Sequence, residues 1–235
     1  MKRFIAFLAL TIFAVLAFAG EAEVKKAWES AFTGMKVESV TKTDYMGLYE
    51  VYAEGEIFYT DEKLTTVLHG ELIDAKTKKN ITLARKQKLS AIKFSDLPLG
   101  SAVKQVRGNG KRVFATFEDP NCGYCKRLAK DMVPLDNATI YTFLYPILSP
   151  ESAEKSAKIW CAPDRVKAWN DWMTQGKEPP VAAANCDFAA VTKNVALGRK
   201  LGITGTPTII FSDGERVSGA LPLADLEQKL NSATN

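Results

Sequence analysis

Apolar and polar residues recur with two different periods along this chain, and the change between the two periods marks its predicted elements. Alternation with a period of two over residues 113–117 predicts a strand. Apolar residues at helical spacing between Leu128 and Met132 predict a helix that opens at residue 122 and ends before Pro134. A strand followed directly by a helix is therefore expected near the middle of the chain.

The same alternation of strand and helix continues to the C-terminus. The predicted elements are a strand at 139–145, a helix at 149–160 with Ser149 as N-cap and Pro150 in its first turn, helices at 167–173 and 189–201, a strand at 208–211, a hairpin turn at Asp213-Gly214, a strand at 216–218 and a helix at 223–230. This order predicts an α/β domain with a central sheet over residues 101–235, with a helical insertion at about 149–200.

A smaller α+β unit is predicted before it, over residues 20–79. It has a short amphipathic helix at 21–32 and three strands between residues 48 and 73. A unit of roughly 60 residues buries only about 60% of its unfolded surface, so it gains stability by pairing with a second copy. Residues 80–100 are rich in Lys and Arg and predict a linker helix whose charges form a solvated face rather than a binding patch.

Residues 1–19 have the three parts of a secretory signal peptide. Lys2 and Arg3 precede an apolar run, and Ala17-Phe18-Ala19 forms a small-x-small cleavage site. A membrane anchor is the alternative, but the run is shorter than the roughly 20 residues that a membrane-spanning helix needs. We expect cleavage after Ala19 and a mature chain that is not inserted in a membrane, in an oxidising space such as the periplasm.

The composition adds little beyond excluding one class of partner. The chain is 46% hydrophobic and 25% charged, and its formal charge of +4 falls to about +2 without Lys2 and Arg3. So small a charge does not favour binding to nucleic acid.

The chemistry is expected at Cys122-Gly123-Tyr124-Cys125. A C-x-x-C that opens a helix after a strand forms a redox-active dithiol, because backbone N–H groups and the positive end of the helix dipole stabilise a thiolate there. Lys126 and Arg127 add positive charge nearby. Cys122 is the expected nucleophile, and Cys125 is expected to resolve the mixed disulfide that forms. The dithiol is itself the redox centre, so no other cofactor is expected.

A C-x-x-C has two other common uses, a zinc site and a structural bridge. A structural zinc site needs four ligands, but His69 is the only histidine and the other cysteines, Cys161 and Cys186, are far apart in sequence, so no metal is expected. A purely structural bridge within the motif would close too small a loop to gain much chain entropy.

Four cysteines allow three pairings, and one of them keeps the C-x-x-C as a unit. That pairing joins Cys161 to Cys186, as a structural disulfide that would stabilise the fold by roughly 3 kcal/mol. The alternative, a second redox relay, is less favoured because neither cysteine has a nearby partner or an evident helix-start position.

Gly205-Thr206-Pro207-Thr208 precedes a predicted strand, where a proline indicates a special turn and a candidate cis bond. Together with the upstream C-x-x-C, this pattern resembles the thioredoxin fold. The resemblance implies that Pro207 is cis and packs beside the dithiol, and that Thr206 contacts both the substrate and the cysteine pair.

A narrower resemblance covers most of the chain after residue 19. The segments that carry it are Cys-Gly-Tyr-Cys after Asp-Pro, Ala157-Lys158-Ile159-Trp160-Cys161, Asn185-Cys186-Asp187 and Ala196-Leu197-Gly198 before Gly205-Thr206-Pro207. The chain thus resembles the DsbC/DsbG family of periplasmic thiol-disulfide proteins. That implies a V-shaped homodimer joined through the N-terminal domains, an apolar cleft that holds misfolded disulfide-containing secreted proteins, and a DsbD-like membrane reductant.

The chain departs from thioredoxin itself around the motif. Asn121 replaces the tryptophan, and Thr116 stands where thioredoxin has a buried acid. We interpret Glu118 and Asp119 as caps of the loop or helix start, which leaves the proton acceptor open. Gly123 and Tyr124 are expected to tune the redox potential.

Three functions remain open, with disulfide isomerase and accompanying chaperone activity as the leading one. The second is a DsbG-like reductase of oxidised single cysteines, or a general oxidoreductase. Gly123 and the Cys161–Cys186 pair weigh against the DsbG-like form, because that class typically carries a proline after its first active-site cysteine. The third is a dimeric holdase, which would not need Cys122.

Overall fold

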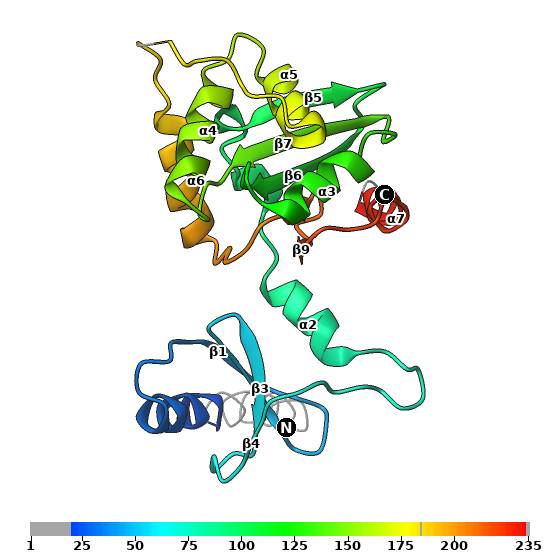
Figure 1. Ribbon diagram of the computed structural model, residues 1–235. Helices are drawn as coiled ribbons and strands as arrows, with labels where there is room; N and C mark the ends of the chain where they lie inside the picture. The colour runs from blue at the N-terminus through cyan, green and yellow to red at the C-terminus, as the bar shows by residue number, and fades with distance from the viewer. Residues whose placement is uncertain (1–19, 184, 234–235) are drawn as a thin grey trace, which may run out of the picture. The chain divides into compact units, whose positions relative to one another are not determined.

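The computed structural model describes residues 20–183 and 185–233, so the predicted signal segment lies outside the described residues. The chain divides into two compact units, with the boundary between Leu89 and Ser90 (Figure 1). No helix within the described residues has both the length and the apolar composition needed to cross a membrane.

The N-terminal unit is a four-stranded antiparallel sheet in sequence order, covered on both faces. Its strands are β1 (Val37–Lys42), β2 (Tyr49–Ala53), β3 (Glu56–Thr60) and β4 (Val67–Leu68). Val24 and Trp28, from a helix over residues 20–31, pack on one face against Val51. Leu89, at the end of α2 (Ile81–Leu89), packs with Tyr52 and Ile57. Two covered faces explain why every residue of β2 is buried.

Three elements of this region differ from the prediction. Strand β1 was not predicted, the last of the three strands predicted between residues 48 and 73 is reduced to β4, and the linker helix predicted at 80–100 ends at Leu89. After α2 the chain forms two 3₁₀ turns, η1 (Phe94–Asp96) and η2 (Leu99–Ser101). Ile92 and Leu97 are buried in the C-terminal core, and this packing overrides the helical pattern of the segment.

The basic residues of α2 do not all form a solvated face, so that interpretation was wrong in part. Arg85 Nε lies 3.0 Å from an oxygen of the buried Glu50, and Lys86 pairs with Glu56 on β3. A buried carboxylate is tolerated only with a partner, so Arg85 ties α2 to the sheet.

Replacing Arg85 with alanine should destabilise the N-terminal unit by about 2 kcal/mol, because it leaves the Glu50 charge buried without its partner. The matched change Lys86→Ala breaks an exposed pair and should destabilise it by less than about 1 kcal/mol. Equilibrium urea denaturation of the full chain measures both values. Equal losses of unfolding free energy in Arg85→Ala and Lys86→Ala would show that the buried Arg85–Glu50 pair stabilises the unit no more than the exposed pair does.

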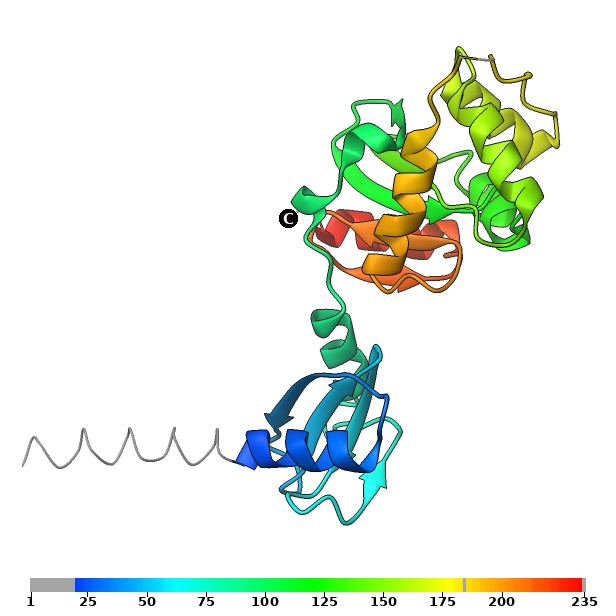
Figure 2. The same ribbon diagram turned by 90° about the vertical axis from the view of Figure 1, so that its left-hand side faces the viewer.

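The C-terminal unit is an α/β domain built on a five-stranded mixed sheet of order β5-β7-β6-β8-β9. The strands are β5 (Val103–Arg107), β6 (Arg112–Glu118), β7 (Ala138–Leu144), β8 (Thr208–Phe211) and β9 (Arg216–Ser218). The central strand β6 runs parallel to β7 and antiparallel to β8. Helices α3 (Gly123–Asp131) and α7 (Leu223–Ala233) cover one face and α6 (Ala189–Lys200) the other (Figures 1 and 2). The predicted fold class is confirmed, although β5 was not predicted.

The part of the predicted insertion that precedes α6 comprises α4 (Pro150–Trp160), α5 (Arg165–Asn170) and a π-helical turn, η3 (Asp171–Gln175). Ser149 caps α4, with its side chain accepting from Ser152 N, as predicted. A disulfide joins Cys161 to Cys186, with a Cα–Cα distance of 5.9 Å, and this is the pairing that keeps the C-x-x-C as a unit. Insertion side chains share one core with the C-x-x-C thiols; they are Ile159, Trp160, Trp169 and Met173. The insertion therefore forms part of the wall around the dithiol.

Candidate active site

The C-x-x-C lies at the start of α3, directly after the central strand. Cys122 is the N-cap residue, with extended backbone angles, and its carbonyl accepts the first helical hydrogen bond, from Lys126 N at 3.0 Å. Both cysteines are free thiols. Cys122 is 6% exposed and Cys125 is fully buried, so an incoming disulfide meets Cys122 first.

The second motif lies against the first, although more than 80 residues separate them in sequence. The Thr206–Pro207 peptide bond is cis. The thiol of Cys122 donates a hydrogen bond to the carbonyl oxygen of Thr206, at 3.3 Å. Pro207 O in turn accepts from Gly219 N at 2.7 Å, which attaches the proline loop to the segment after β9. The structure therefore brings Cys122 and Thr206 into the contact that the resemblance implied.

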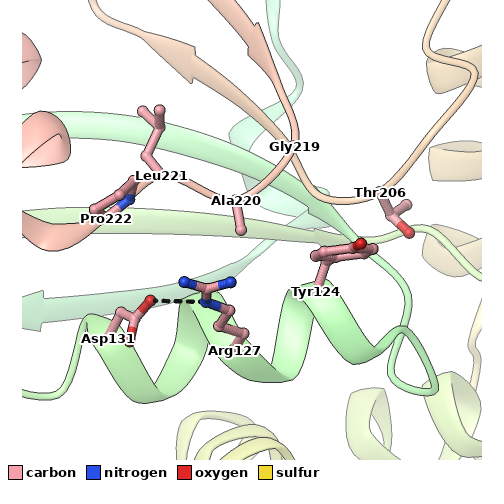
Figure 3. A pocket seen from close by; sticks show the side chains of 8 residues that line it. All are labelled: Tyr124, Arg127, Asp131, Thr206, Gly219, Ala220, Leu221 and Pro222. Atoms are coloured by element: carbon pink, nitrogen blue, oxygen red, sulfur yellow. Dashed lines mark ion pairs between the residues drawn. The ribbon is translucent and has the colours of Figure 1, made fainter.

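A groove of about 330 Å³ opens beside the two motifs (Figure 3). Tyr124 and Thr206 lie at one end, and Arg127 and Asp131 of α3 form an ion pair along one side. The opposite wall is the segment after β9, residues 219–222, with apolar side chains at its centre. The Tyr124 side chain is 67% exposed, so a large aromatic surface stands beside the reactive thiol.

Asp119 fastens the loop that precedes Cys122. Its Oδ1 accepts from Asn121 N at 2.8 Å and from Ser152 Oγ at 2.7 Å, and its Oδ2 accepts from the backbone N–H groups of Ile147 and Leu148. The carboxylate is fully buried and all its contacts are donors. Asp119 thus has the loop-capping role expected of it.

Glu118 does not cap anything, so the expectation that it does was wrong. It is the last residue of β6 and is fully buried, and its Oε1 accepts from Thr116 Oγ1 at 2.7 Å. Its Oε2 has no hydrogen-bond partner among the described residues. Burial raises the pKa of Glu118 to about 7, although the hydrogen bond from Thr116 opposes the shift.

The two thiols differ in their electrostatic surroundings. Burial raises the pKa of the Cys125 thiol well above its usual range, and the negative charge of Glu118 raises it further, as does that of Cys122. Cys125 therefore stays protonated in the free dithiol. It can attack only when its proton is removed during the reaction itself.

A tryptophan that the sequence did not single out links the insertion to the active-site loop. Trp172, in η3, donates from Nε1 to the carbonyl oxygen of Pro120 at 2.6 Å. The ammonium groups of Lys126 and Lys155 lie 4.3 Å and 3.7 Å from its ring centroid. Lys126 therefore packs on the indole ring. No local sequence signal indicated these contacts, because they join η3 to α3, to α4 and to the loop before Cys122.

The described residues hold no group of three or more His, Cys, Asp or Glu side chains that could bind a metal ion. A free thiol pair at a helix start, beside a cis-proline peptide and on a mixed sheet of this order, defines a thiol-disulfide oxidoreductase of the thioredoxin fold.

Comparisons with known proteins give the family. Residues 99–234 match the family described as "Thioredoxin-like domain", and residues 15–83 match the "Disulfide bond isomerase protein N-terminal domain". The "Probable thiol:disulfide interchange protein DsbC" of Bordetella pertussis is 53% identical over 88% of this chain and 73% of its own length. The Escherichia coli K12 "Thiol:disulfide interchange protein DsbC" is 28% identical over 98% and 95%. The chain belongs to the DsbC family of thiol:disulfide interchange proteins and is an enzyme of the disulfide isomerase class.

A solved structure agrees with this assignment. The crystal structure of the disulfide interchange protein from Neisseria gonorrhoeae is 42% identical, with a TM-score of 0.56. The match covers 59% of this chain and 99% of that one.

Proposed function

We propose that this protein reshuffles wrong disulfides in secreted proteins, with Cys122 as the attacking sulfur. The observation that carries the proposal is the placement of Cys122: it is the more accessible thiol, it caps a helix N-terminus, and it touches the cis-proline loop beside an open groove. A substrate chain that is extended in the groove would present its disulfide to Cys122 between Tyr124 and Thr206.

The proposed reaction has an attack and an escape. Cys122 attacks one sulfur of the substrate disulfide, which releases the other as a thiolate and forms a mixed disulfide. The freed substrate thiolate can then attack elsewhere in the substrate, so that pairing changes without net oxidation. If rearrangement stalls, Cys125 displaces the substrate, and Cys122 and Cys125 become bonded to each other. Gly123 and Tyr124 would set the balance between these outcomes through the redox potential.

The setting of this reaction is also proposed. The N-terminal unit would join two copies into a homodimer, supported by its small size and by its match to the isomerase N-terminal domain. Its substrates would be misfolded secreted proteins in the periplasm, reached through a cleavable signal peptide. A DsbD-like membrane reductant would return the pair to the dithiol form. The Cys161–Cys186 disulfide is assigned a structural role because it lies outside the groove.

The test is recovery of activity by a scrambled multi-disulfide substrate in a glutathione buffer, with sedimentation of the same full chain. We expect native pairing to return, and a dimer at micromolar concentration. A chain that reduces the substrate without restoring native pairing would be a general oxidoreductase or a DsbG-like reductase. One that prevents aggregation without changing disulfides would be a holdase, and a monomer would overturn the dimer.

A further inference from the structure

Glu118 is a buried ionisable group with no role in the attack by Cys122 or the escape through Cys125. The register of its strand determines the face of the sheet from which its side chain projects. Glu118 pairs with Leu144 in the parallel β6–β7 ladder, so the two side chains project from the same face. Leu144 belongs to the core that contains Cys122 and Cys125. The carboxylate therefore projects toward the face that α3 covers, where Cys125 is buried.

Of the two carboxylate oxygens of Glu118, Oε2 has no hydrogen-bond partner among the described residues and is available to take a proton. Thr116 Oγ1 donates to Oε1 and lies 3.3 Å from Thr142 Oγ1, so both hydroxyls stand on the strand side of the carboxylate. On the helix side, the core around Leu144 contains the thiols of Cys125 and Cys122, and the insertion contributes apolar side chains to it. Burial and the hydrogen bond from Thr116 are the two influences that set the pKa of Glu118. An unpartnered buried oxygen is normally avoided, so its presence calls for an explanation.

We propose that Glu118 is the proton acceptor for Cys125 when Cys125 resolves the mixed disulfide. This inference rests on the proposed function, because it concerns the escape step of that reaction. It goes beyond the thiol pair by assigning the proton to the carboxylate at the end of β6.

The carboxylate of Glu118 takes the proton of the Cys125 thiol as the sulfur of Cys125 attacks that of Cys122. The Cys122–Cys125 bond forms, the bond from Cys122 to the substrate breaks, and the substrate sulfur leaves as a thiolate. The substrate disulfide has then been reduced by two electrons and the enzyme pair oxidised by two. When a reductant regenerates the dithiol, the protonated Glu118 returns its proton to Cys125.

The pKa of Glu118 suits this task near neutral pH. An acceptor works best when its pKa lies near the working pH, because it is then sufficiently deprotonated and still basic enough to take a proton. Burial has moved the pKa of Glu118 to about 7, whereas an exposed glutamate would be a much weaker base.

The test follows two sulfur displacements in one reaction. The reduced full chain is mixed with stoichiometric 5,5′-dithiobis(2-nitrobenzoic acid), and release of the coloured thiolate is followed by stopped flow. The first release reports attack by Cys122, and the second reports displacement by Cys125. In Glu118→Gln the rate of the first phase should stay within about twofold of that of the unaltered chain. The rate of the second phase should fall by about a hundredfold above pH 7, and its pH dependence should no longer show a midpoint near pH 7.

Thr116→Val is the companion variant, because it keeps the acid and removes its hydrogen bond. That bond lowers the pKa of Glu118, so its loss should move the midpoint of the second phase to higher pH while the phase itself persists. A second phase with unchanged rate and midpoint in Glu118→Gln overturns the proposal. If Glu118→Gln does not fold, an unmoved midpoint in Thr116→Val overturns it instead. Absence of the first phase in the unaltered chain would instead count against the proposed function.

Discussion

Substitution of Cys122 by alanine should reduce reshuffling of a scrambled substrate to the uncatalysed rate, a loss on the order of a thousandfold or more. Cys125 cannot replace it, because Cys125 is fully buried and its raised pKa keeps it protonated. The measurement is the initial rate of activity recovery in a glutathione buffer.

Cys125→Ala is the matched control, since it removes one sulfur from the same motif. It should retain attack by Cys122 and accumulate a mixed disulfide with the substrate, visible by non-reducing electrophoresis. If Cys122→Ala kept the activity and Cys125→Ala lost it, the roles of the two sulfurs would have to be exchanged. If neither change mattered, the activity would not come from this thiol pair.

Glu118→Gln should stabilise the reduced protein at pH 8 by roughly 3 kcal/mol and leave its stability almost unchanged at pH 4. The pKa of Glu118 is raised from 4.5 to about 7 on folding, so the folded state favours the protonated carboxyl. The native protein therefore loses stability as the pH rises from about 4.5 to about 7, and the loss is constant above that range. Glutamine has the shape of the acid and no charge to bury, so it should escape this loss.

Denaturant unfolding between pH 4 and pH 8 measures the difference between the variant and the unaltered chain. Glu154→Gln is a suitable control, because Glu154 lies exposed on α4 beside Lys158 and should give no pH-dependent difference between pH 5 and pH 8. If the free energy of unfolding of Glu118→Gln varied with pH in parallel with that of the unaltered chain, the raised pKa of Glu118 would be contradicted. The stability measurement does not depend on any catalytic step, so it tests the burial of Glu118 independently.

The sequence predicted the elements that have strong local patterns and missed those that depend on tertiary packing. Strand β6 and helix α3 were predicted because the spacing of apolar residues changes abruptly from strand-like to helical at the cysteine motif. Strands β1 and β5 were missed because both lie at sheet edges, where polar residues interrupt the alternation. The linker helix was predicted too long because Ile92 and Leu97 continue its pattern but pack into the C-terminal core.

The candidate site was predictable where chemistry and spacing coincide. The two cysteines and their order of exposure follow from the local motif, whereas the cis Thr206–Pro207 bond was implied only by the resemblance to the thioredoxin fold. The burial of Glu118 does not, because an acid before a helix start is usually a cap. The predicted strand ends at residue 117. If its alternation with a period of two is continued by one residue, Glu118 lies on the same face as Thr116, and this pattern would have indicated that Glu118 is buried in the sheet.

The contacts of Asp119 bear on how readily the site can both form and break a disulfide. Backbone and hydroxyl donors from the loop, from the segment after β7 and from α4 hold both of its oxygens, and none of these donors is a thiol. The loop before the two sulfurs is thus held by side-chain contacts of Asp119 in which neither sulfur takes part. A frame held in this way is preorganised for both the making and the breaking of a disulfide.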